Sequence, residues 1–145
     1  QWVLTTRETT EFRLQTEQMG RSLVQWLQHG ECAGDRRVAR CAALTPAPTW
    51  PVAYALAGVL AEASVQTLLL AFAFSWAENM VQAAMKAVPL GQIAAQRILQ
   101  RLTHEIPSAV DRAVQMSLDD CQVMTPMLAI LSSHHETQYS RLFRS

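Results

Sequence analysis

The stretch SVQTLLLAFAFSWAENMVQAAMKAV, residues 64–88, decides the fold class of this chain. Ser64 is a suitable N-cap for a helix, and Pro89 and Gly91 break the helix after Val88. Polar residues within the stretch recur at helical spacing, which places them on one narrow stripe of an otherwise apolar cylinder. The stripe consists of Ser75, Glu78, Asn79, Gln82 and Lys86. This pattern predicts the central helix of a soluble bundle or an oligomer interface.

The polar stripe also bears on a membrane assignment. A membrane-spanning helix needs about 20 predominantly apolar residues. The most apolar run, Leu68 to Phe74, is preceded by Glu62 and Gln66 and followed by the stripe, so we expect no membrane span. We interpret the stripe first as a water-facing edge of the helix. The alternative is a buried polar network that serves a partner or a channel.

The remaining composition favours helices throughout. The chain has 145 residues, half of them hydrophobic, which is enough for one domain with its own core. Few glycines and prolines stand among many Ala, Leu, Gln and Arg residues, and this favours an all-α fold. Because 12 basic residues balance 12 acidic ones, we expect no nucleic-acid partner. Three widely spaced cysteines are typical of a reducing cytoplasm.

Apolar periodicity and breaking residues predict a bundle of about six helices in a single domain, residues 1–145, with a C-terminal tail. Pro107 is expected to open a separate short helix, because a proline costs nothing at the first helical position. Thr125 and Pro126 repeat a cap-then-proline signature for the last helix. The expected helices span about 3–28, 52–62, 64–88, 92–105, 107–116 and 126–133, with a short turn over 38–44. Because the first residue is Gln1 and the opening residues already have a helical pattern, we expect the chain to begin inside a longer protein.

Several segments together resemble the UreF family of urease accessory proteins. They are SWAE at 75–78, PLGQ at 89–92 and, most specifically, HETQYSRLFRS at 135–145. The opening residues 7–13 and QMG at 18–20 are also similar to the middle region of that family. The resemblance covers essentially the whole chain, and what is missing is the first third of the family pattern. We therefore expect the N-terminal helices of the family fold to be absent here.

The resemblance implies a function without catalysis. Proteins of the UreF family are all-helical and dimerise. They bind the UreD (also called UreH) accessory protein and the UreG GTPase, which they recruit and regulate for nickel insertion into apo-urease. By this resemblance the chain binds no cofactor directly, and its partners handle nickel and GTP.

The resemblance also implies that the C-terminal tail, residues 134–145, takes part in assembling that complex. Its chemistry agrees, because aromatic side chains and arginine are frequent anchors of protein interfaces. Such a strip can also fold on binding. Packing of the tail onto its own helices is the alternative. The predicted partner-binding residues are His135, Glu136, Gln138, Tyr139, Arg141, Leu142, Phe143, Arg144 and Ser145, and the predicted interface or stripe residues are Trp76, Glu78, Gln82 and Lys86. Core packing is the default expectation for Trp76.

Other patterns favour catalysis or metal binding only weakly. His134 and His135 point about 100° apart on a helix, so we interpret them as surface or capping residues, with transient nickel contact as the alternative. Cys32 and Cys41 with His29 match no standard zinc spacing. We expect no catalytic residue, since there is neither a nucleophile elbow nor a phosphate-binding glycine loop. Two competing functions remain: a small-molecule-binding helical regulatory domain, and a direct nickel carrier that uses His and Cys.

Overall fold

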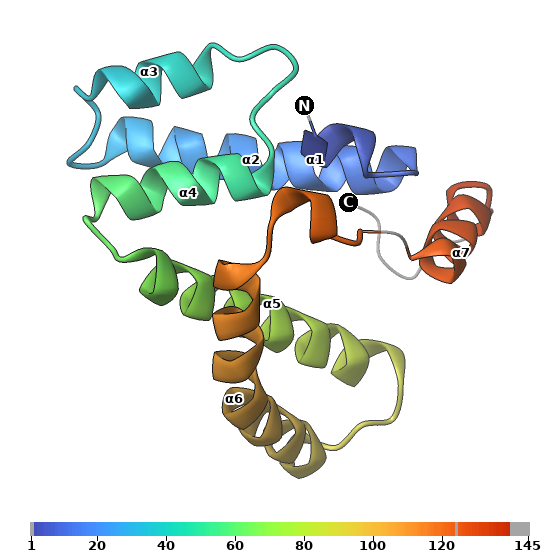
Figure 1. Cartoon of the computed structure of the whole chain (residues 1–145). Helices are drawn as coiled ribbons and strands as arrows, with labels where there is room; N and C mark the ends of the chain where they lie inside the picture. Colours follow the sequence, from blue (N-terminus) through green and yellow to red (C-terminus); the bar gives the residue numbers. More distant parts are fainter. Residues whose placement is uncertain (1, 124, 140–145) are drawn as a thin grey trace. The chain divides into compact units, whose positions relative to one another are not determined.

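The computed structural model describes residues 2–123 and 125–139, which Figure 1 shows as helices joined by loops. No β-strand occurs among these residues, so the prediction of an all-α fold is confirmed. A 3-10 turn, η1, covers Leu118–Asp120. The α-helices are α1 (Trp2–Thr5), α2 (Thr10–His29), α3 (Arg36–Ala42), α4 (Trp50–Leu60), α5 (Val65–Ala87), α6 (Gln92–Gln115) and α7 (Pro126–Glu136).

The chain divides into two compact units. The first contains the residues up to Ala61 and the described residues from Gln122 onward, and the second contains Glu62–Cys121. The first unit is therefore discontinuous in sequence, with the second inserted into it. The expectation of a single domain stays a prediction.

The core of the first unit lies among α2, α3 and α4. Val24 and Leu27 of α2, Val38 and Cys41 of α3, and Ala53 of α4 form one buried cluster. Burial raises the pKa of the Cys41 thiol above its ordinary value, because the charged thiolate is poorly solvated there. Cys41 is therefore an apolar core residue.

Helix α3 begins and ends two residues earlier than the short turn predicted for 38–44, and its start is well capped. Asp35 accepts a 2.7 Å hydrogen bond from the backbone N–H of Arg37 and is also bonded by the Arg37 guanidinium. The guanidinium bond, followed by the backbone bond, lowers the pKa of Asp35 to about 2. An ionised carboxylate at this position also suits the positive end of the helix dipole.

Helix α2 makes an unusually close approach to the chain that enters α4. Thr16 and Gly20 lie one turn apart on the same face of α2, and both are buried. The Thr16 hydroxyl accepts a 3.2 Å hydrogen bond from the backbone N–H of Trp50. A Cβ atom built on Gly20 would meet the backbone of Pro48 and Thr49, with Thr49 C at 2.7 Å. Glycine is therefore required at this point of α2.

The second unit contains the pair α5 and α6. Ser64 caps α5 by accepting a hydrogen bond from Thr67 N, as the sequence predicted. Ala77 and Val81 of α5 and Ala95 and Val110 of α6 are buried. The contact between α5 and α6 buries few side chains, and many apolar side chains of both helices remain exposed.

One described helix, α5, is long and apolar enough to cross a membrane when judged by length and composition alone. Its most apolar window has a mean hydropathy of 1.2, and 11% of that window is buried. Core helices of soluble proteins can meet the same criterion, so the expectation that α5 lies outside a membrane stays a prediction.

The division of the chain into helices was predicted wrongly at two places. The segment 3–28 is interrupted, because the chain turns after α1 and Thr9 starts α2 afresh by accepting a hydrogen bond from Phe12 N. Conversely, Pro107 starts no new helix and lies inside α6. Pro107 lacks an N–H for the carbonyl four residues earlier, yet the helix continues because Val110 beyond it is buried in the same unit as Ala95. Packing on both sides of the proline outweighs the lost bond.

Candidate partner-binding site at the C-terminus

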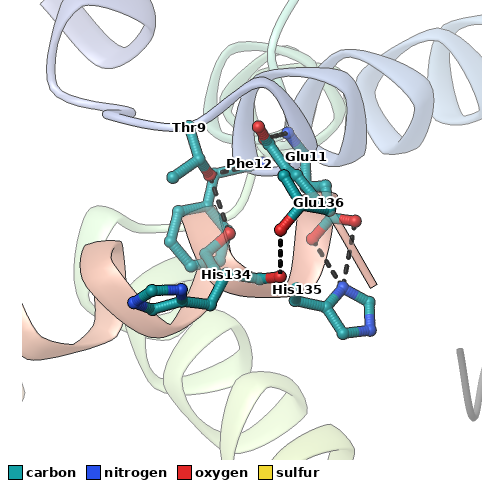
Figure 2. Close-up of polar contacts among 8 residues, drawn as sticks. Thr9, Glu11, Phe12, His134, His135 and Glu136 are labelled. Carbon is teal, nitrogen blue, oxygen red and sulfur yellow. Dashed lines mark hydrogen bonds and ion pairs between the residues drawn. The ribbon is translucent and has the colours of Figure 1, made fainter. Parts of the chain in front are cut away.

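The C-terminal helix α7 lies against the first turn of α2, within the first unit. The hydroxyls of Thr9 and Ser132 share a hydrogen bond of 2.8 Å, and both residues are buried (Figure 2). Ser132 is the buried residue of α7, whereas the large apolar side chains of that helix are exposed. Polar contacts therefore define how α7 meets α2.

Glu136 supplies a second cap for α2. Its Oε1 accepts a 2.9 Å hydrogen bond from the backbone N–H of Glu11, in the first turn of α2. The first N–H groups of a helix have no partner inside the helix, and a carboxylate there also suits the helix dipole. Thr9, the N-cap residue of α2, accepts a hydrogen bond from Phe12 N, and Glu136 of α7 accepts one from Glu11 N. The start of α2 is thus completed by the end of α7.

His135 pairs with the side chain of Glu11. Its Nδ1 lies 2.9 and 3.0 Å from the two carboxylate oxygens (Figure 2). An ionised carboxylate can only accept, so Nδ1 carries the proton, and the pair is ionic when the imidazole is protonated. The His135 and Glu11 side chains are 39% and 29% exposed, so water weakens the attraction without removing it.

His134 occupies a different position from its neighbour. Figure 2 shows its ring turned away from the Glu11 carboxylate, on the other side of α7 from the His135 ring. The two rings diverge, as the helical spacing predicted. Across 2–123 and 125–139, no group of three or more His, Cys, Asp and Glu side chains is placed to hold a metal ion. Of the cysteine candidates, Cys41 belongs to the core and Cys32 packs against it.

The predicted partner-binding residues fall into three groups. His135 and Glu136 belong to α7, which runs three residues beyond its predicted end at Ser133, and both contact α2 of the same chain. Gln138 and Tyr139 come after the helix and are exposed, Tyr139 completely. The other predicted residues lie outside the described part of the chain: Arg141, Leu142, Phe143, Arg144 and Ser145.

The predicted residues of the central helix lie on the second unit. Glu78, Gln82 and Lys86 of α5 are exposed, which agrees with a water-facing stripe. Trp76 is 62% exposed, so the default expectation that it packs in the core was wrong. The pair of α5 and α6 buries small residues such as Ala77, and Trp76 points away from them.

Open grooves, rather than enclosed cavities, occur on the first unit. One of about 490 Å³ is lined by α2 residues including Gln15 and Met19, together with Trp50. A second, of about 370 Å³, lies between α7 and the start of α2 and includes Glu8 and His134. Ligand pockets usually enclose most of a small molecule. These grooves therefore give little support to a small-molecule-binding domain.

Sequence reasoning missed the contribution of Thr9, Glu11 and Ser132. Thr9 and Ser132 are 123 positions apart, and Glu11 and Glu136 are 125 apart. A threonine followed by an acidic residue is a usable local signal for a helix start. Nothing local indicates that the opposite end of the chain completes that start.

The chain, whose described helices end with α7 held on α2, matches the family model described as UreF over residues 1–103. Proteins with the name "Urease accessory protein UreF" are similar to it along 99% of its length: that of Polaromonas sp. (strain JS666 / ATCC BAA-500) is 57% identical and that of Paracidovorax citrulli (strain AAC00-1) is 62% identical. The chain belongs to the UreF family.

The chain spans 61% of the length of the Polaromonas relative and 58% of that of the Paracidovorax relative. These alignments include the C-terminal region, whereas the match to the family model ends at residue 103. No solved structure matches the chain.

Proposed function

We propose that the protein containing this chain is a scaffold for urease maturation. It binds the UreD (UreH) accessory protein and recruits and regulates the UreG GTPase, so that nickel is inserted into apo-urease. In this proposal the partners handle GTP and nickel, and the protein works as a homodimer in the cytoplasm without catalysing a reaction. The name "urease accessory protein" of its relatives supports a helper role.

The observation that carries the proposal is the position of Tyr139. This tyrosine is fully exposed, and it lies three residues beyond the end of a helix whose last two residues contact α2. The residues after it in sequence include Arg141, Leu142 and Phe143. Aromatic and arginine side chains dominate the binding energy of many interfaces, because they bury large areas and make directed hydrogen bonds. A segment of this composition next to an anchored helix is suited to a partner protein.

A second contact surface is proposed on α5, around Trp76. Tryptophan is enriched at the energetic centres of interfaces, and this one is 62% exposed on the same helix as the exposed polar residues Glu78 and Gln82. We assign this surface to the homodimer or to a partner, as the interface role predicted from the sequence implies. Lys86 lies further along the same stripe and would add a charged contact at its edge.

Truncation of the intact protein after Gln138 tests the proposal. This truncation removes Tyr139 and the residues after it while leaving the contacts of His135 and Glu136 with α2 in place. Individual hot-spot residues contribute about 2 kcal/mol or more, so affinity for UreD should fall at least about tenfold. Recruitment of UreG should fall with it. Co-purification with tagged UreD, and circular dichroism at 222 nm for helical content, are the measurements.

Met127→Ala is the matched control for the truncation. Met127 is an exposed apolar residue of α7, and its replacement removes a side chain without touching the segment after Gln138. This variant should bind UreD as the wild type does. Capture of UreD by the truncated protein at the wild-type level would contradict the proposed role of the C-terminal segment.

A further inference from the structure

The placement of α7 depends on a small set of polar groups. The apolar residues Met127, Leu128, Ile130 and Leu131 are each more than half exposed, so burial of these side chains contributes little to docking. The contacts with α2 come instead from Ser132, His135 and Glu136, which reach its first turn. Directed polar contacts of this kind fix an orientation more strictly than apolar contacts do.

The charges at this contact are complementary. Glu11 and Glu136 bring two carboxylates to the first turn of α2, and His135 lies against one of them. Glu8 and His134 line the adjacent groove, and are the further titratable residues there. Loss of the His135 imidazole would remove the Nδ1–H donor that faces the Glu11 carboxylate and, when the ring is protonated, its positive charge. The imidazole therefore sets which approach of α7 to α2 is electrostatically favourable.

The position of the pair also constrains the C-terminal segment. His135 is four residues from Tyr139, and Glu136 is the last residue of α7. Four residues can span at most about 14 Å even when fully extended. Whatever fixes His135 on α2 therefore also keeps Tyr139 within that distance of His135.

We propose that Glu11 and His135 are positioning residues that hold α7 on α2 and so set where the C-terminal segment meets its partner. This inference rests on the proposed function, because it assigns the pair a role in presenting that segment. Neither residue needs to touch the partner. The pair acts by fixing the end of α7 before the partner binds, which lowers the entropic cost of association.

A charge swap in the intact protein tests the pair. His135→Glu places a carboxylate against Glu11, and Glu11→His places two imidazoles together, so each single variant should weaken docking. The double variant Glu11→His/His135→Glu restores an acid facing a base. His134→Glu makes the same charge change one residue earlier, on a ring turned away from Glu11 (Figure 2), and is the matched control.

Two measurements are made on every variant. Hydrogen exchange of the α7 amides, followed by mass spectrometry without any partner, reports the docking of α7. Partly exposed ion pairs contribute up to about 1 kcal/mol, so each single variant should exchange about fivefold faster. Capture of UreD reports how well the C-terminal segment is presented. It should fall most in the variants whose α7 amides exchange fastest. The double variant should recover most of both losses, and His134→Glu should resemble the wild type.

The inference would be overturned if the double variant were no better than the single ones, or if His134→Glu behaved like His135→Glu. It would also be overturned if the α7 exchange changed while UreD capture stayed at the wild-type level in every single variant. Failure of the proposed function gives a different result, since truncation after Gln138 would then leave capture unchanged. If the single variants merely failed to fold, a second substitution would not restore them. Recovery of slow α7 exchange and of UreD capture in the double variant therefore excludes that explanation.

Discussion

Replacing Gly20 by alanine should force α2 away from the entry to α4. The added Cβ would meet Pro48 O, and would lie 2.7 Å from Thr49 C and 2.8 Å from Pro48 C. All three are backbone atoms, so no side chain can rotate to make room. Separation of the two segments would also stretch the hydrogen bond from Trp50 N to Thr16.

The expected change in the free energy of unfolding combines two destabilising effects and one stabilising effect. Overpacking costs about 1–3 kcal/mol. Weakening the Thr16 bond costs about 1 kcal/mol more. Alanine gains up to about 1 kcal/mol over glycine inside a helix. The free energy of unfolding should therefore fall by about 2 kcal/mol.

Urea unfolding of the intact protein, followed by circular dichroism, measures this change. Gly34→Ala is the control, because nothing lies within 4 Å of a Cβ built there, and its effect should stay within about 0.5 kcal/mol. Helix propensity alone predicts the opposite sign for Gly20→Ala. A variant as stable as the wild type, or more stable, would refute the close approach of α2 to Pro48.

Two further predictions concern the ends of helices. Asp35 has a pKa of about 2 against an ordinary 3.8, so its contribution to stability is present above pH 3.8 and is lost as the pH falls through about 2. Arg37→Gln should raise the pKa of Asp35 toward 3.8, measurable by NMR titration of the carboxyl carbon, and an unchanged pKa would contradict the assigned cause. Glu62 comes after α4 with a φ of 54°, so Glu62→Gly should raise the free energy of unfolding by about 1 kcal/mol. Ala61→Gly, at a φ of −83°, should lower it, and equal signs in urea unfolding would exclude the conformational explanation.

Local signals in the sequence predicted the class of fold and several helix ends. Ser64 caps α5 with its side chain, because capping is decided by neighbouring residues. Pro126 starts α7 directly after Thr125, although the Thr125 side chain makes no capping hydrogen bond. Pro107 misled, since a proline suits the first turn of a new helix and can also be tolerated inside one when packing compensates. The residue alone does not distinguish these cases.

The sequence predicts a partner-binding segment but not its geometry. The string that includes Tyr139 and Phe143 predicts a contact segment by its residue types together with the family resemblance, and that role stays a prediction. That His135 would pair with Glu11 could not be foreseen, because the two are 124 positions apart and neither carries a local signature of the other. Trp76 was misjudged because a tryptophan on an apolar helix usually packs inside, whereas the packing of α5 against α6 buries small side chains.

The completion of α2 by residues of α7 has a consequence for biosynthesis. Helices α2, α3 and α4 lie close together in sequence, and they can pack as soon as Leu60 has left the ribosome. The groups of α7 that complete the first turn of α2 are translated only after α5 and α6. We therefore expect the nascent chain to carry a frayed α2 start until α7 emerges, so that a translation product that stops before α7 lacks this contact from the outset.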